Sequence, residues 1–322
     1  MKILAISAGS VAGNTELTLL TALQAVQAVK PDATIQLIRL EEIRIGNRLI
    51  TGQFEHPFTK EQKRTAADSG PDDRPFVLEA IMEADAIIIG APVLNRGAAG
   101  LLKYFADKTL GPFQDVSVAT EMVAQGRGER VDQRILKKRV AALVSVGGAV
   151  SSDWTTLGLP MLHQLLFPMG IMVVDQVHIY GAGLPGSVVL DDDALSRAAQ
   201  LGRSLVEQAS QPVEGRKYAG APGKCPICNL NVVALIGGNQ VECASCAARG
   251  TVRIVDGEVV LDFTQEGLNS SVFRMQALVE HGAEIKKVAG ELRPKMQEIP
   301  NKVKPLLNWG AAITLVPPSL SG

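Results

Sequence analysis

Aromatic residues make up only 4% of this chain of 322 residues, and neither sign of charge is in excess. Lysine and arginine together number 32, against 33 aspartates and glutamates. Nucleic acid and anionic lipid attract proteins with a strong positive excess, so this balance gives no reason to expect either as a partner. No apolar run is long enough to cross a membrane, and we expect no membrane attachment.

Cysteine is also scarce. There are four cysteines, all between residues 225 and 246, which leaves none for a long-range disulfide. The chain begins directly in an apolar strand pattern, without the basic segment, apolar core and cleavage site of a secretory signal. Both observations favour a cytoplasmic protein, because thiols stay reduced in that compartment.

What the sequence does contain is a globular pattern. Hydrophobic residues make up 46% of it, and its length allows one large domain plus a small one. Residues 3–6 are an apolar run that predicts a buried strand. Glycine and small hydroxyl-bearing residues follow, and a helical pattern then runs from Leu17 to Val29. This order presents backbone N–H groups and the positive end of a helix dipole to an anion.

The same alternation of strand and helix continues along the chain. Residues 44–75 and 109–134 are polar and irregular, so we expect long loops there. Five strands that alternate with helices predict an α/β fold with a parallel sheet and helices on both faces. Beyond the first strand and helix, strands are predicted at 33–40, 84–91, 139–146 and 171–179, and helices at 76–83, 97–108, 153–169 and 191–209. Pro160 and Pro168 are candidates to kink or shorten the helix at 153–169.

The composition changes after residue 212. Residues 213–223 are a predicted linker between a large domain at 1–212 and a cysteine-containing module at 224–263. That module ends in alternating apolar residues around Asp256-Gly257, a pattern typical of a β-hairpin. Residues 264–322 are predicted to form a helical arm, heavily charged from Leu268 to about Gln297, and a tail. We expect the tail, 300–322, to lie extended on the surface or on a neighbouring subunit.

The loop after the first strand has the composition of a phosphate site. Small side chains let the backbone approach a ligand, and hydroxyl groups add hydrogen-bond donors. The loop has no lysine, so it is not the P-loop of an ATPase, and its glycines lack dinucleotide spacing. An ordinary tight turn between strand and helix is the structural alternative. The candidate phosphate ligands are Ser7, Gly9, Ser10, Val11, Gly13, Asn14 and Thr15.

Two further loops follow the third and fourth predicted strands. Ligands of open α/β sheets bind at the carboxyl ends of the strands, where these loops meet the first one. Their backbone groups and apolar side chains suit the polar edge and the faces of a flavin ring. Structural alternatives are a turn for Asn95, a solvated surface charge for Arg96 and core packing for Trp154. The candidate ring contacts are Pro92, Val93, Leu94, Asn95, Arg96, Gly97, Gly147, Gly148 and Trp154.

Three segments resemble the NADPH-dependent FMN reductase family of the flavodoxin-like superfamily, and especially its iron–sulfur flavoprotein branch. Residues 8–15, Ala-Gly-Ser-Val-Ala-Gly-Asn-Thr, are similar to the family's phosphate loop but are two residues shorter and lack its arginine. Residues 84–93, followed by the Leu-Lys-Tyr-Phe-Ala-Asp of 102–107, are similar to the second loop and its helix, with Leu94 in place of the usual tyrosine. Gly147-Gly148 and the segment from Trp154 resemble the third flavin loop.

The resemblance covers roughly the first two-thirds of the chain. It implies a flavodoxin-like sheet of order 2-1-3-4-5, bound FMN, and NAD(P)H as the reductant. The iron–sulfur branch carries a cysteine cluster after its second strand, but residues 43–73 contain no cysteine. No [4Fe–4S] cluster can therefore be held there.

The cysteines form two pairs, Cys225-x-x-Cys228 and Cys243-x-x-Cys246, beside the predicted hairpin. This arrangement predicts a zinc ribbon in which four thiolates bind one Zn²⁺. A rubredoxin-type iron site is the alternative, and the short gap without an aromatic residue disfavours it. Such zinc sites are usually structural, because a module of this size buries too little apolar surface to fold alone.

We therefore expect an FMN-dependent NAD(P)H oxidoreductase that passes electrons to a quinone, a nitro or azo aromatic, free flavin or a partner enzyme. No catalytic side chain is predicted, because the flavin carries the chemistry. The amphipathic arm and Trp309 favour a homo-oligomer. Two alternatives remain open: a non-enzymatic flavodoxin-like electron carrier that docks through the ribbon, and a flavin-free binding protein.

Overall fold

The computed structural model describes residues 1–46, 71–109 and 115–313. Met1–Ala277 form one compact unit and Leu278 onward a second, and each is described by itself. Among the described residues, no helix is both long enough and apolar enough to cross a membrane.

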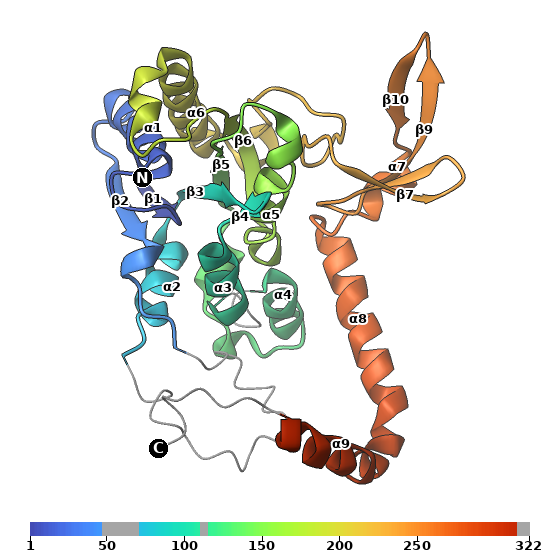
Figure 1. The fold of residues 1–322 in the computed structure, drawn as a ribbon. Helices are drawn as coiled ribbons and strands as arrows, with labels where there is room; N and C mark the ends of the chain where they lie inside the picture. The colour runs from blue at the N-terminus through green and yellow to red at the C-terminus, as the bar shows by residue number, and fades with distance from the viewer. Residues whose placement is uncertain (47–70, 110–114, 314–322) are drawn as a thin grey trace. The chain divides into compact units, whose positions relative to one another are not determined.

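A parallel sheet forms the centre of the first unit, with the order β2-β1-β3-β5-β6 (Figure 1). The flavodoxin-like order predicted from the sequence is confirmed. The inner strands β1, β3 and β5 are nearly continuous apolar runs, because both faces of the sheet are covered there. Their bounds are β1 Lys2–Ser7, β2 Thr34–Arg39, β3 Ala86–Leu94, β5 Val140–Val146 and β6 Met172–Ile179, and the short β4, Gly97–Ala98, pairs antiparallel with β3.

Helices α1 (Asn14–Val29) and α6 (Asp192–Ser210) lie side by side on one face of the sheet. Gly202 makes this pairing possible, since a Cβ there would lie 2.1 Å from the carbonyl oxygen of Ala22. The other face packs against α2 (Arg74–Glu83), α3 (Gly100–Thr109) and α5 (Gly158–His163).

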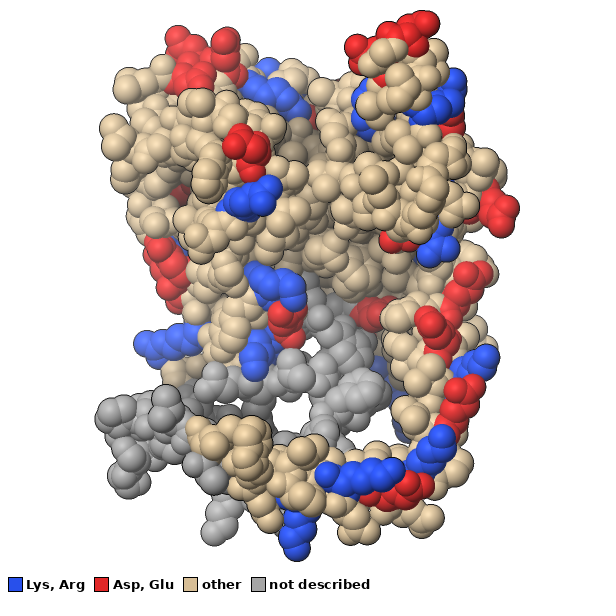
Figure 2. Space-filling view, turned by 45° about the vertical axis from the view of Figure 1, so that its right-hand side comes forward, with Lys and Arg blue, Asp and Glu red and all other residues tan. Residues whose placement is uncertain are grey.

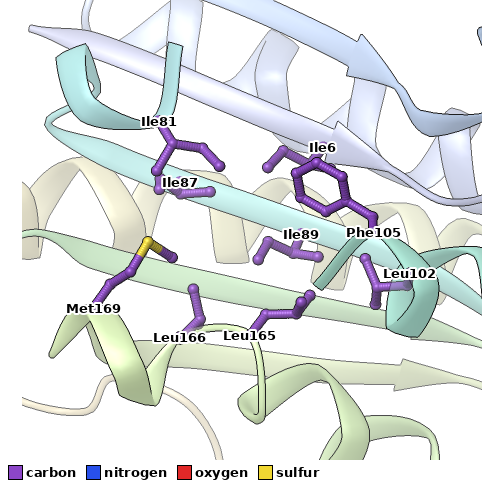
Figure 3. A pocket seen from close by; sticks show the side chains of 9 residues that line it. All are labelled: Ile6, Ile81, Ile87, Ile89, Leu102, Phe105, Leu165, Leu166 and Met169. Carbon is purple, nitrogen blue, oxygen red and sulfur yellow. The ribbon is translucent and has the colours of Figure 1, made fainter. Parts of the chain in front are cut away.

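The core on this second face holds a cavity of about 10 Å³ between the sheet and its helices (Figure 3). Its walls are entirely apolar, so it offers no hydrogen bonds to a water molecule and is expected to stay dry. The lining side chains are Ile6, Ile81, Ile87, Ile89, Leu102, Phe105, Leu165, Leu166 and Met169.

Two sequence predictions on this face need correction. The helix expected at 153–169, with Pro160 and Pro168 as candidates to kink or shorten it, is three short pieces, Ser152–Trp154, α5 and Phe167–Met169. Pro160 and Pro168 lack the N–H that would continue an α-helix, which explains the break. The loop expected at 109–134 contains helix α4 (Val116–Ala124), because the Asp115 carboxylate caps it by accepting the N–H groups of Ser117 and Val118.

The cysteine module is a four-stranded antiparallel sheet of order β10-β9-β8-β7. Asp256 and Gly257 both have positive φ in the turn of the β9–β10 hairpin, which confirms the predicted hairpin. A short helix, α7 (Gln265–Asn269), follows. The strands are β7 Val233–Gly237, β8 Gln240–Cys243, β9 Arg249–Val255 and β10 Glu258–Asp262.

The chain is then helical from Met275 to Ile313, through α8 (Met275–Leu292), a 3₁₀ segment (Arg293–Glu298) and α9 (Ile299–Ile313). The expectation of an extended segment from residue 300 is therefore wrong as far as residue 313. Pro300 occupies the first turn of α9, where its missing N–H costs little, and Pro305 is accommodated inside the helix. The rest of that tail, 314–322, lies outside the described residues.

Candidate functional site

Three loops meet at the carboxyl edge of the sheet, after the neighbouring strands β1, β3 and β5. The strand order reverses between β1 and β3, which is where ligands of open α/β sheets bind. The N–H of Ala8 donates to the carbonyl oxygen of Gly90 at 2.8 Å, so the first two loops diverge from paired strands. The structure thus brings together the loops predicted from the sequence.

The first loop presents free donors where helix α1 begins. In the part of the chain that the structure describes, the backbone N–H groups of Asn14, Thr15 and Glu16 have no partner. Gly9 lets the loop approach the helix, because a Cβ there would lie 2.8 Å from Cβ of Thr15. A cradle of free N–H groups at a helix start fits a phosphate group. These donors therefore fit the phosphate of FMN.

Two other donors of this loop are already taken by carboxylates. Val11 N–H donates to Glu41 Oε1 at 2.7 Å, and Ala12 N–H donates to Glu16 Oε2 at 2.5 Å. Glu16 is only 2% exposed and forms an ion pair with Arg39. Val11, a predicted phosphate ligand, thus uses its N–H within the protein.

Sequence reasoning missed both Glu16 and Arg39. The signal lay in the register, since Arg39 ends β2 directly beside Ser7 at the end of β1.

The side chain of Asn14 binds a fourth loop. Its amide donates to the carbonyl oxygens of Ala182 and Leu184, at 2.9 and 2.7 Å, and its oxygen accepts the N–H of Val188 at 2.9 Å. Asn14 therefore offers a ligand only its backbone N–H, while its side chain ties the start of α1 to the loop that precedes α6.

The second loop is a two-residue hairpin turn between β3 and β4. Asn95 and Arg96 both have positive φ, at 50° and 71°, as a type I′ turn requires. Arg96 Nε donates to the carbonyl oxygen of Asp153 at 2.9 Å, and its own carbonyl accepts the N–H of Leu157 at 3.2 Å. Arg96 thus joins the second loop to the third.

Large apolar side chains are exposed along this edge. Trp154 is 63% exposed and Leu94 is 59% exposed, so neither is part of the core. Val150 and Leu184 add apolar surface from the third and fourth loops. We refer to these four side chains as the apolar rim. Exposed apolar surface beside polar backbone groups suits a flat, largely apolar ligand.

Beneath the third loop, His178 Nδ1 lies 2.9 Å from Ser145 Oγ. Burial lowers the pKa of His178 to about 4, so the imidazole is neutral at physiological pH. A Cβ at Gly147 would lie 3.2 Å from His178 Nε2, which shows how closely the loop passes over the ring. The apolar patterns of β5 and β6 gave no indication of this pair.

The NADPH-dependent FMN reductase family matches residues 1–180, more than half of the chain. The chain belongs to this family. It is a flavin-dependent oxidoreductase, an enzyme with FMN and NAD(P)H as its cofactors, as the resemblance predicted.

Similarity to individual proteins extends beyond the residues that the family matches. A flavone synthase of Aspergillus candidus, cfoJ, is 44% identical over 327 residues and covers 100% of both chains. A solved structure described as a flavone reductase is 26% identical, with a TM-score of 0.79, and covers 99% of this chain and 100% of its own. An FMN-dependent NADH:quinone oxidoreductase of Bordetella petrii is 31% identical over 158 residues, 48% of this chain and 71% of that protein.

A second candidate site lies in the cysteine module. The Sγ atoms of its four cysteines lie within 4.8 Å of one another, and all four residues are buried. The Cys225–Cys246 and Cys228–Cys243 Sγ separations are 3.5 and 3.4 Å. Zn–S bonds of about 2.3 Å in a tetrahedron place the sulfurs about 3.8 Å apart, so the four thiols fit Zn²⁺.

The two cysteine pairs have the same backbone conformation. Asn229 and Ala247 follow the second cysteine of each pair and have φ of 56° and 58°. Each donates its N–H, at 2.9 Å, to the carbonyl oxygen of the first cysteine. The predicted pairing of two equivalent knuckles is thus present.

The cysteine cluster is tied to the sheet through Gln176 on β6. The Gln176 amide donates to the carbonyl oxygens of Cys228 and Asn229, at 3.0 Å each, and its oxygen lies 2.7 Å from His163 Nε2. Because the amide oxygen can only accept, His163 Nε2 carries the proton. Burial lowers the pKa of His163 to about 4, which keeps the ring neutral. Its ring stacks on Phe273, with centroids 5.4 Å apart.

Proposed function

We propose that this enzyme transfers two electrons between NAD(P)H and the C2–C3 bond of a flavonoid, interconverting a flavone and a flavanone. The two compounds differ by two hydrogen atoms across that bond, which is conjugated to a ketone in the flavone. In the reducing direction a hydride from NAD(P)H and a proton from solvent saturate the bond, and NAD(P)⁺ is released. In the oxidising direction the proton returns to solvent and NAD(P)⁺ takes up the hydride.

The observation that carries the proposal is the extent of similarity. Two proteins named for flavones match this chain over its full length, including the cysteine module and the arm. The named quinone oxidoreductase matches only 158 residues. One of these proteins is called a flavone synthase and the other a flavone reductase. The two names describe opposite directions of one reaction, the oxidation or reduction of one carbon–carbon bond.

The site geometry supports a planar aromatic substrate. FMN, when bound, supplies a ring that accepts a hydride and gives it up again. The free N–H groups at the start of α1 would hold its phosphate, and the second and third loops would border its ring. The apolar rim, above all Trp154 and Leu94, would then contact the aromatic rings of the substrate and exclude water.

The test is turnover in both directions under anaerobic conditions. Protein loaded with FMN should convert apigenin and NADPH or NADH into equimolar naringenin, measured by chromatography, and should form apigenin from naringenin and NAD(P)⁺. Trp154→Ala should raise the KM for apigenin, whereas Val213→Ala, an exposed apolar residue outside the rim, should not. Reduction of menadione without any reaction of apigenin would contradict the proposal and would indicate that the enzyme is a quinone reductase.

We also propose that the four cysteines bind zinc in a structural role. Elemental analysis should give one zinc per chain, and Cys243→Ser should lose both the metal and thermal stability. Ser245→Ala is the matched control, because the Ser245 hydroxyl lies in the same knuckle and has no partner among the described residues. A red protein that contains iron would instead indicate a rubredoxin-type site.

Self-association of the enzyme is the third part of the proposal. It is supported by the exposed apolar side chains of the helical arm, which include Trp309 and Leu306.

A further inference from the structure

The helical arm carries an apolar repeat of seven residues. Every seventh residue is leucine or isoleucine, and the residue four positions after each of the first five is small or apolar. Such a repeat is the pattern of a coiled coil, in which these two positions face a partner helix. The first set is Leu278, Ile285, Leu292, Ile299, Leu306 and Ile313, and the second is Gly282, Ala289, Met296, Val303 and Gly310. We call the two sets together the seam.

Most of the first set is exposed. Five of its members, from Ile285 to Ile313, are exposed, whereas Leu278 is buried. Acidic and basic side chains are interspersed along the arm beside this apolar surface (Figure 2). Pro294, Pro300 and Pro305 all fall outside the seam.

The arm cannot cover its own seam. An antiparallel hairpin of two helices needs a non-helical turn between them. Here α8, the 3₁₀ segment and α9 follow one another without an interruption of the helical backbone. Helix α8 therefore cannot fold back along α9 of the same chain.

We propose that the seam pairs with the seam of a second copy of this chain, as an antiparallel two-stranded coiled coil. This deepens the self-association proposed above. The exposed repeat indicates that the partner is a helix. The sizes of the seam residues indicate that this helix is the arm of a second copy and that it runs antiparallel.

In a parallel pair, identical residues would face each other. Gly282, Ala289 and Gly310 would then form layers with almost no side-chain volume, and unfilled volume in a core is destabilising.

In an antiparallel pair centred on Pro294, each small residue faces a large one. Gly282 faces Leu306, Ala289 faces Ile299 and Gly310 faces Leu278. The two remaining layers are Ile285 with Val303 and Leu292 with Met296. Side-chain volume is then spread over the whole seam, as close packing requires.

Figure 1 shows α9 turned away from the direction of α8, and this bend is compatible with the register. A two-fold axis that passes Pro294 places α8 of one copy along α9 of the other. The 3₁₀ segments of both copies then meet at the axis, so the interruption of the α-helix occurs at the same place in both. Such a two-fold contact is the commonest symmetry of protein dimers.

Mass measurement of the full, FMN-loaded chain tests the pairing. Leu292→Glu with Leu306→Glu should halve the mass found by light scattering. Gln297→Glu with Asn301→Glu adds the same charge outside the seam and should leave the mass unchanged. Bound FMN and NAD(P)H oxidation should persist in both, so a failure here is distinct from a failure of the flavonoid proposal. An unchanged mass in the seam variant would overturn the pairing.

Cross-linking tests the orientation. When Ile285→Cys and Val303→Cys proteins are mixed and oxidised, a cross-linked dimer should form that neither protein forms alone. Leu306→Cys should not cross-link with itself, and cross-linking there would overturn the antiparallel register. Wild-type protein oxidised in the same way is the control for disulfides formed by the four cysteines of the cysteine module. A monomeric wild type that sediments with phosphatidylserine vesicles would also overturn the proposal, because the seam would then serve a membrane surface.

Discussion

Gln176 Nε2 lies 3.0 Å from the carbonyl oxygen of Cys228, so a side chain of the central sheet hydrogen-bonds the backbone of a predicted metal ligand. The same amide group also bonds Asn229 and His163. A buried polar group that loses its partner costs about 1–3 kcal/mol. The cysteine module is therefore joined to the flavodoxin-like sheet by polar contacts as well as by apolar packing.

Replacing Gln176 should destabilise this junction. In Gln176→Leu two carbonyl oxygens and His163 Nε2 lose their partner, and we expect a loss of about 2–4 kcal/mol in the free energy of unfolding, measured with urea. Gln164→Leu is the matched control, because Gln164 reaches the module only through a 3.4 Å bond to the carbonyl of Ser245. Equal losses in both variants would contradict a special role for Gln176.

The tie between Asn14 and the fourth loop should matter for FMN binding. Asn14→Ala removes three hydrogen bonds, which hold the loop that contains Leu184 and Val188. We expect an FMN dissociation constant about tenfold higher, since the phosphate donors at the start of α1 lose their support. Fluorescence titration with FMN measures it. Thr21→Ala, which removes only a local bond to the carbonyl of Leu17, should bind FMN like the wild type.

Gly9 should tolerate no side chain. In Gly9→Ala the new Cβ would collide with Thr15, so the loop must move away from the helix start and weaken FMN binding by about tenfold or more. Gly100→Ala provides the comparison, because a Cβ at Gly100 meets no atom within 4 Å. Its FMN affinity should be unchanged. Normal FMN binding by Gly9→Ala would show that the phosphate lies elsewhere.

Stability should fall in mild acid, and His178 should contribute to the fall. Its pKa is about 4 in the folded protein, against 6.5 for a free imidazole. Between these values the unfolded chain binds a proton that the folded chain does not, so the free energy of unfolding decreases as pH falls from about 6.5 to 4. In His178→Asn, urea unfolding should depend less on pH over this range. A pH dependence of His178→Asn equal to that of the wild type would contradict this assignment.

The parts of the fold that local pattern determines could be predicted from sequence. The inner strands β1, β3 and β5 are nearly continuous apolar runs, and the knuckles and the Asp256-Gly257 hairpin depend on neighbours along the chain. The division of 153–169 into three pieces and the helix from Ile299 to Ile313 were not predicted, because the extent to which a proline interrupts a helix depends on the surrounding packing.

The three loops of the candidate site were predictable because each follows the carboxyl end of one of three neighbouring strands, β1, β3 and β5. The roles of Asn14, Glu16 and Gln176 were not, because their partners lie far away in sequence or depend on strand register.

The pairing of α1 with α6 has a consequence for synthesis of the protein. The loop after β1 is synthesised well before its partners, because the loop that holds Asn14 and the helix that covers α1 are made about 170 residues later. Nascent chains that end before Ser210, the last residue of α6, should therefore expose the apolar face of α1 and should not retain FMN. The ribbon and the arm emerge only after that, so each chain can complete its flavin site before it meets a second copy.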